Sequence, residues 1–123
     1  MSTLQSVARF KIYPGKLAEF KKLSAECMRL AREKDKGTLR YELFFNEEQT
    51  ECVVYEEYVD AEACVDHFKN MGETAAAIFK TGEVSGEIWG ILNEAMTKGV
   101  AGQNIKVYRP YMSLSGEAGE EKE

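Results

Sequence analysis

The chain has 123 residues, the size of one domain with a single hydrophobic core. Its 16 basic and 21 acidic residues give a net charge of −5, and no basic stripe indicates a nucleic-acid interface. No apolar run approaches the roughly 20 residues that span a bilayer, and the first residues lack the pattern of a secretory signal. We therefore expect a cytoplasmic protein that binds neither nucleic acid nor membrane.

The cysteine content indicates reduced thiols rather than a disulfide or metal framework. Cys27, Cys52 and Cys64 are an odd number and lie far apart, which in a chain without a signal predicts free cysteines in a reducing compartment. A structural zinc site needs clustered cysteine and histidine, and the chain has one histidine and no C-x-x-C. We therefore expect no metal site.

The first half of the chain predicts a strand, a helix and a hairpin. Residues 3–13 alternate between apolar and polar, which is typical of a strand, and Pro14-Gly15 ends it. Residues 16–36 place apolar side chains at spacings of three and four, which predicts an amphipathic helix. Residues 38–46 and 51–59 are strand-like and are joined by four polar residues, so we expect an antiparallel hairpin.

The next segment predicts helices followed by a loop. Asp60 is a good N-cap for a helix over residues 61–70, and residues 74–79 predict a second helical piece after Gly72. Residues 80–93 contain three glycines, so we expect mostly loop with at most a short extended piece.

The end of the chain predicts one more helix and strand. Asn93 caps a brief helix that ends near Gly99, and residues 104–112 predict the last strand. Residues 113–123 are rich in glycine and glutamate and predict a disordered acidic tail. One domain over residues 1–112 accounts for the rest of the chain.

This order of elements is βαββαβ, which predicts an α+β, ferredoxin-like fold with helices on one face of an antiparallel sheet. The two hairpin strands carry apolar side chains on both faces, with Phe44 on one strand and Val53 and Tyr55 on the other. Because the helices cover one face only, we expect a second copy of the sheet to cover the other and form a homodimer. The alternative is that these aromatic side chains remain exposed.

Residues 55–67 are the most informative stretch. Their pattern E-x-Y-x-D followed by A-x-x-x-H, formed by Glu56, Tyr58, Asp60, Ala63 and His67, resembles the antibiotic biosynthesis monooxygenase family. The opening strand and Pro-Gly turn over residues 9–16, Phe20, and residues 37–43 with Tyr41 also resemble that family. The resemblance covers residues 7–79 well and the last strand loosely.

The resemblance implies a dimeric α/β barrel made of two ferredoxin-like sheets, with a pocket between each sheet and its own helices. Some members of the family oxygenate electron-rich phenols, anthrones or quinols with O₂ and without metal or flavin. Others degrade haem, and others have no established activity. The implied partner is a small aromatic molecule, and the implied pocket is lined by Ala8, Phe10, Tyr41, Phe79 and Trp89.

Three residues are candidates for catalysis: His67, Tyr58 and Glu56. An imidazole titrates near neutral pH and suits a proton acceptor, whereas the structural interpretation is a helix histidine that hydrogen-bonds Glu56 or a backbone carbonyl. Tyr58 lies on the same strand face as Glu56 and either orients a phenolate or packs in the core. We expect the Glu56 carboxylate to be buried with His67 or Arg9 as its partner.

Two further positions remain open between alternatives. Trp89 lies in the expected loop and is either a lid over the pocket or a packing residue. Tyr108 and Tyr111 lie on opposite faces of the last strand, and one of them lines the dimer interface. Cys64 and His67 are three residues apart on a helix, so a thiolate–imidazolium pair is a further hypothesis.

The chain departs from the haem-degrading relatives, which carry asparagine where Ala8 stands and tryptophan where Tyr58 stands. It also lacks the second histidine that many relatives have. The sequence leaves three hypotheses: a cofactor-independent monooxygenase acting on a quinol or anthrone, a non-catalytic ligand-binding or stress-response barrel, and haem binding or degradation. It does not identify the substrate or the higher oligomeric state.

Overall fold

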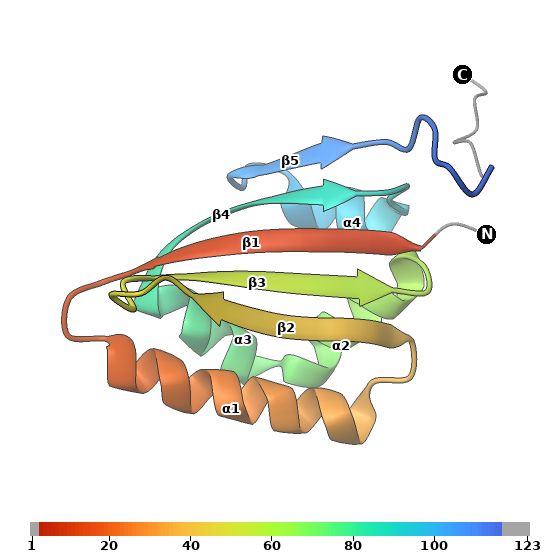
Figure 1. Cartoon of the computed structure of the whole chain (residues 1–123). Coiled ribbons are helices and arrows are strands. Elements are labelled where there is room, and N and C mark those ends of the chain that lie inside the picture. The colour runs from red at the N-terminus through yellow and green to blue at the C-terminus, as the bar shows by residue number, and fades with distance from the viewer. Residues whose placement is uncertain (1–2, 117–123) are drawn as a thin grey trace.

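The computed structural model describes residues 3–116 as a twisted sheet with helices packed against one of its faces (Figure 1). No helix among these residues is long and apolar enough to cross a membrane. The elements in chain order are β1 Leu4–Ile12, α1 Leu17–Lys34, β2 Thr38–Phe45, β3 Glu51–Tyr58, α2 Ala61–Met71, α3 Glu73–Ile78, η1 Phe79–Thr81, β4 Gly82–Trp89, α4 Glu94–Val100 and β5 Ile105–Tyr108.

The order of strands in the sheet is β2-β3-β1-β4-β5. The first four strands run antiparallel to their neighbours, which is the arrangement of a ferredoxin-like fold. The prediction of an α+β, ferredoxin-like domain is therefore confirmed. The β2–β3 hairpin and the helices α1, α2 and α3 lie close to where the sequence predicts them.

The prediction that residues 80–93 are mostly loop is wrong. Residues 82–89 form β4, which pairs along its whole length with the central strand β1. Gly82 and Gly86 lie where the two backbones are closest, since a Cβ atom would lie 2.5 Å from the Lys11 carbonyl oxygen and 2.7 Å from the Val7 carbonyl oxygen, respectively. These glycines therefore mark close backbone contacts inside a sheet rather than a loop.

The last strand also differs from the prediction. β5 covers only Ile105–Tyr108 and runs parallel to β4, so the sheet is mixed rather than purely antiparallel. A parallel neighbour needs a crossover connection, and α4 supplies it. Its N-cap is Asn93, as expected, because the Asn93 side chain accepts a hydrogen bond from the Met96 amide at 2.9 Å.

The end of the chain is described only as far as Gly116, and Ser113–Gly116 carries no helix or strand. The rest of the predicted acidic tail lies outside the described residues. The extent of the domain over residues 1–112 stays a prediction.

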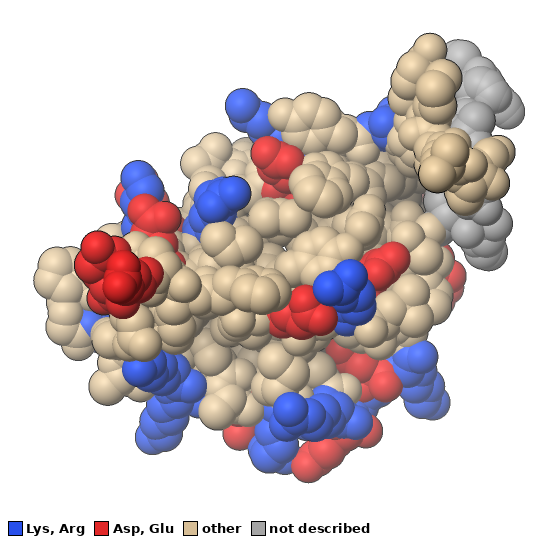
Figure 2. Space-filling view, viewed as in Figure 1, with Lys and Arg blue, Asp and Glu red and all other residues tan. Residues whose placement is uncertain are grey.

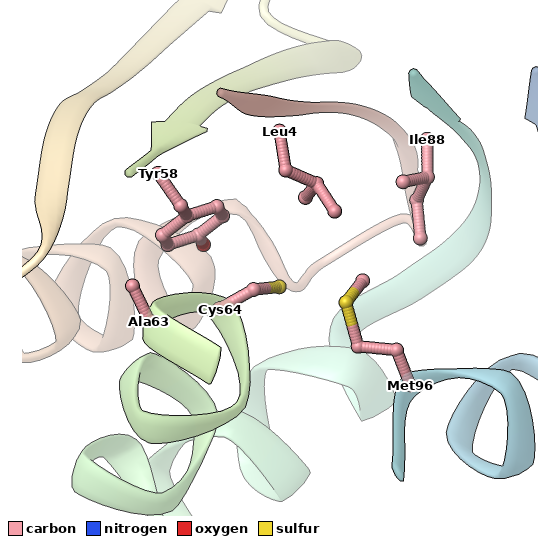
Figure 3. Close-up of a cluster of buried hydrophobic side chains, with 6 residues drawn as sticks. All are labelled: Leu4, Tyr58, Ala63, Cys64, Ile88 and Met96. Atoms are coloured by element: carbon pink, nitrogen blue, oxygen red, sulfur yellow. The ribbon is translucent and has the colours of Figure 1, made fainter. Parts of the chain in front are cut away.

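The hydrophobic core lies between the sheet and the helices. Its largest cluster joins β1, β3 and β4 to α2 and α4 (Figure 3) and consists of Leu4, Tyr58, Ala63, Cys64, Ile88 and Met96. A second cluster packs α1 and α3 on the other half of the sheet and consists of Phe10, Phe20, Cys52, Val54 and Ile78. The opposite face of the sheet bears no helix (Figure 1).

Candidate active site

The sequence-predicted trio converges inside the interface between the sheet and the helices. Alternation along β3 directs Glu56 and Tyr58 toward the helical layer. Asp60 begins α2 by accepting a hydrogen bond from the Ala63 amide at 2.9 Å, and this start places His67 on the buried side of the helix. Glu56 is 7% exposed, His67 1% and Tyr58 0%. The three side chains therefore share one buried region.

The trio forms a connected polar group. The Tyr58 hydroxyl donates to Glu56 Oε1 at 2.5 Å. His67 Nε2 lies 3.8 Å from Glu56 Oε2, which is longer than a hydrogen bond. The rings of Tyr58 and His67 are 5.4 Å apart between centroids. The expected partner of Glu56 was His67 or Arg9, but the partner in hydrogen-bond contact is Tyr58, and Arg9 lies on the other face of β1 because of strand alternation.

Asp35 completes this polar group and was not predicted from the sequence. It is the residue that ends α1, and its side chain is 4% exposed. Its Oδ2 accepts a hydrogen bond from the Thr38 hydroxyl at 2.7 Å and lies 2.6 Å from His67 Nδ1, within hydrogen-bond distance. Its Oδ1 accepts a hydrogen bond from the Asn70 side-chain amide at 2.8 Å. Nothing local marks this residue, because its partner His67 is 32 residues further along the chain.

The two carboxyl groups of the site are shifted in opposite directions. Burial opposes ionisation of Asp35, but hydrogen bonds from His67, Asn70 and Thr38 outweigh it and hold its pKa below the ordinary value. Burial raises the pKa of Glu56, and the attraction of His67 and the hydrogen bond from Tyr58 offset only part of that rise. Burial also raises the pKa of the Tyr58 hydroxyl well above its ordinary value. The imidazole therefore lies between a carboxyl group whose pKa is lowered, at Asp35, and one whose pKa is raised, at Glu56.

The predicted pocket residues fall on both faces of the sheet. Ala8, Phe10 and Tyr41 lie on the helical side, and Phe79 stacks on Phe10 with ring centroids 5.8 Å apart. Tyr41 meets His67 edge-on at 5.1 Å between ring centroids. Trp89 is the last residue of β4 and belongs to the opposite face, where it donates to Glu87 at 2.8 Å. Because Trp89 ends a strand on that face, the prediction that it lines the pocket or forms a loop lid over it is wrong.

An apolar cavity of about 300 Å³ lies between α1 and the edge strand β2, and neither Asp35 nor any of the three catalytic candidates lines it. Its lining is formed by Phe20, Lys21, Ser24, Ala25, Met28, Leu43 and Phe45. Leu43 is the neighbour of Tyr41 on the same face of β2. The Ser24 hydroxyl oxygen in this lining is buried and has no hydrogen-bond partner among the described residues.

The other hypotheses receive less support from the geometry. Cys64 packs in the core cluster beside Tyr58 (Figure 3), and burial raises its pKa to about 12, which disfavours a thiolate. Both ring nitrogens of His67 face carboxyl groups, with Nδ1 2.6 Å from Asp35 Oδ2 and Nε2 3.8 Å from Glu56 Oε2. Within residues 3–116, no group of three or more histidine, cysteine, aspartate or glutamate side chains is arranged to hold a metal ion.

Known structures share this fold. MupZ from Pseudomonas fluorescens is 22% identical with a TM-score of 0.79, and the match covers 95% of this chain and 97% of MupZ. A putative antibiotic biosynthesis monooxygenase from Caulobacter crescentus is 25% identical with a TM-score of 0.63, covering 70% and 86%. SnoaB from Streptomyces nogalater, a cofactor-independent oxygenase solved as the N63A mutant, is 17% identical with a TM-score of 0.64, covering 76% and 96%.

No curated protein sequence matches the chain. The family model for antibiotic biosynthesis monooxygenase matches residues 4–78, which is more than half of the chain and contains β1 to α3 with all four residues of the buried polar group. The chain therefore belongs to the antibiotic biosynthesis monooxygenase family.

Proposed function

We propose that this protein is a cofactor-independent monooxygenase that oxidises a small electron-rich aromatic molecule, such as a quinol or anthrone, with O₂. One observation carries the proposal: a member of this family buries an imidazole and a carboxyl group side by side between its sheet and its helices, and burial raises the pKa of that carboxyl. A likeness in fold to a cofactor-independent oxygenase, SnoaB, adds support.

The reaction requires a general base and a site from which water is excluded. An anthrone first loses a proton to give an electron-rich anion, which can transfer an electron to O₂. Its methylene carbon is then oxidised to a carbonyl, one oxygen atom of O₂ stays in the product and the other leaves as water. The substrate supplies all the electrons, so no further reductant is needed. Exclusion of water protects the intermediate radicals and strengthens the interactions that stabilise the anion.

In this proposal His67 is the base, Glu56 takes up or returns the proton, and Tyr58 holds Glu56 in place through the hydrogen bond from its hydroxyl. Ala8, Phe10, Tyr41 and Phe79 contact the aromatic rings of the substrate. Because Glu56 and His67 are almost fully buried, a substrate reaches them only when a covering side chain moves. The three free and buried cysteines support the cytoplasmic location expected from the sequence.

The test is O₂ uptake with dithranol, a simple anthrone, measured with an oxygen electrode against the uncatalysed rate. The wild type is expected to accelerate uptake and to form the quinone with one O₂ consumed per product. The variant His67→Gln keeps an amide that can donate to Asp35 but has no basic nitrogen, so it is expected to lose at least 100-fold in rate, as an order of magnitude. Asp66→Asn, an exposed change at the neighbouring position, is the control.

Two results would count against the proposal. Activity of His67→Gln equal to that of the wild type removes the role of His67. Ligand binding without any O₂ uptake, measured with a set of quinols and anthrones, favours the non-catalytic ligand-binding barrel instead.

We also propose that the protein is a homodimer that pairs through the open face of its sheet. This face bears an apolar patch made up of Val7, Phe44, Val53, Tyr55, Trp89 and Tyr108. In Figure 2, uncharged surface covers much of the same face, and acidic and basic side chains lie within it as well as at its edges. Phe44 is 55% exposed in the single chain, and an exposed patch of this kind is typical of an interface.

The dimer is tested by sedimentation velocity of Phe44→Glu. Phe44 lies on the edge strand β2, and a charge placed there would be buried against apolar side chains of the partner, so the variant is expected to sediment as a monomer at concentrations where the wild type is a dimer. Phe68→Glu is the control, because Phe68 is also exposed but lies on α2, on the helical side. A monomeric wild type, or a dimer that persists in Phe44→Glu, would contradict this interface.

A further inference from the structure

Asp35 has no role in the function proposed above, yet it is the most completely bonded carboxylate of the site. Each of its two oxygens lies within hydrogen-bond distance of at least one side chain, and these partners come from the start of β2 and from α2. A buried carboxylate is costly unless its bonds are satisfied, so this arrangement is specific rather than incidental.

We propose that Asp35 is a positioning residue that holds His67 as the Nδ1–H tautomer and directs its unprotonated Nε2 at Glu56. The four side chains then form a row in the order Asp35, His67, Glu56, Tyr58. A proton that His67 takes from a substrate can be shared along this row. The effect on catalysis rests on the proposed function, whereas the tautomer of His67 does not.

The tautomer follows from the bonds to Asp35. An ionised carboxylate only accepts hydrogen bonds, and its other two partners, Thr38 and Asn70, also donate to it. His67 Nδ1, which lies 2.6 Å from Asp35 Oδ2, must therefore carry a hydrogen. In the neutral imidazole the second nitrogen, Nε2, is then the one with a free electron pair.

The ring plane is fixed by its neighbours. Tyr41 and Phe68 meet the imidazole edge-on, each with ring centroids 5.1 Å away and at angles of 85° and 83°. Tyr58 packs against it at 57°. These contacts and the bond to Asp35 leave Nε2 facing Glu56 Oε2 at 3.8 Å.

On the Nε2 side of the imidazole, Glu56 is placed where it can share a proton with His67. Glu56 Oε1 accepts a hydrogen bond from the Tyr58 hydroxyl, while Oε2, the oxygen that faces His67, forms no hydrogen bond to a side chain among the described residues. The titratable groups around His67 include Asp35 at the end of α1, Tyr41 on β2, Glu56 and Tyr58 on β3, and Cys64 on α2. The pKa of Asp35 is lowered and that of Glu56 is raised, so the imidazole lies between two carboxyl groups whose pKa values are shifted in opposite directions.

The experiment uses the fact that His67 is the only histidine in the chain. Protein labelled with ¹⁵N-histidine gives one pair of ring nitrogen signals, and their shifts and couplings to the ring protons report the tautomer directly. The wild type at a pH where His67 is neutral is expected to show Nδ1–H. Asp35→Asn keeps the size of the side chain but presents an amide, and it is expected to show a mixture or a majority of Nε2–H.

The kinetic readout separates positioning from simple structural support. With dithranol, Asp35→Asn is expected to lower kcat about 10- to 100-fold while KM changes by less than about twofold, because the base is misdirected rather than the pocket deformed. Asp66→Asn makes the same chemical change on the exposed side of α2 and is expected to leave both the spectrum and the kinetics unchanged.

The outcomes are distinct. A wild-type spectrum of the Nε2–H tautomer, or an Asp35→Asn spectrum identical to the wild type, overturns the proposal. If Asp35→Asn does not fold, the wild-type spectrum alone still decides the tautomer. If the wild type shows Nδ1–H but oxidises no anthrone or quinol, the proposed monooxygenase function fails while the positioning of His67 by Asp35 stands.

Discussion

Gly37 is expected to be essential for the contact that brings Asp35 to His67. It lies in the connection between α1 and β2, two residues after Asp35, and its carbonyl accepts a hydrogen bond from the Val59 amide at 2.9 Å. A Cβ atom at this position would lie 2.6 Å from the Ala63 Cβ and 2.9 Å from the Val59 Cγ2. Both distances are well inside the roughly 3.5–4.0 Å of a normal carbon contact. Gly37→Ala must therefore push this connection away from α2.

The expected cost follows from this overlap. Ala63 has no flexible side chain that can yield, so the backbone must move, and overpacking of this kind costs about 1–3 kcal/mol. For a chain of this size, a loss of 1 kcal/mol lowers Tm by about 3–5 °C, so Gly37→Ala is expected to unfold about 3–15 °C below the wild type. The assay is thermal unfolding followed by far-UV circular dichroism, with urea unfolding as a second measure.

Gly99→Ala is the matched control for this prediction. Gly99 lies in α4, and a Cβ atom there would have no neighbour within 4 Å. Because alanine favours a helix over glycine by up to roughly 1 kcal/mol, this variant is expected to be as stable as the wild type or more stable. Equal stability of the Gly37→Ala variant and the wild type would refute the reasoning that close packing of Gly37 against α2 holds Asp35 in place.

Two other predictions concern the buried ionisable groups. Burial raises the pKa of Glu56 above its ordinary value of 4.5, so ionisation of this carboxyl opposes folding. The stability of the wild type that is due to Glu56 therefore falls as the pH rises from about 4.5 through the pKa of Glu56 in the folded protein. The Glu56→Gln side chain does not ionise, so the free energy of unfolding of this variant, measured by urea titration, is expected to rise relative to that of the wild type across that pH window. A difference between the two free energies that does not change with pH would contradict the raised pKa. Cys27, Cys52 and Cys64 are buried and burial raises the pKa of each thiol. We expect 5,5′-dithiobis(2-nitrobenzoate) to label none of them in the native protein and all three after denaturation, and rapid native labelling would show that the core opens readily.

The errors in the sequence-based predictions have a common cause. Gly82 and Gly86 predicted a loop because glycine interrupts local strand patterns, whereas the reason for each glycine is the β1 backbone passing beside it. The same error placed Trp89 in a loop, when pairing with β1 directs it to the open face. A strand was predicted over residues 104–112, but it covers only Ile105–Tyr108, and its parallel direction depends on the crossover through α4.

Part of the candidate site could be predicted from local patterns in the sequence, and the part that depends on distant packing could not. Glu56 and Tyr58 are two residues apart on a strand, and His67 follows on the next helix, so alternation, a capping residue and helical periodicity are enough to place all three on the buried side. Asp35 comes from the end of another helix, and its bond to His67 depends on how closely the α1–β2 connection approaches α2. Local patterns encode which face a side chain occupies. Only the packing of distant elements determines which polar group it meets there, and at this site that packing brings the Asp35 carboxylate to the single histidine of the chain.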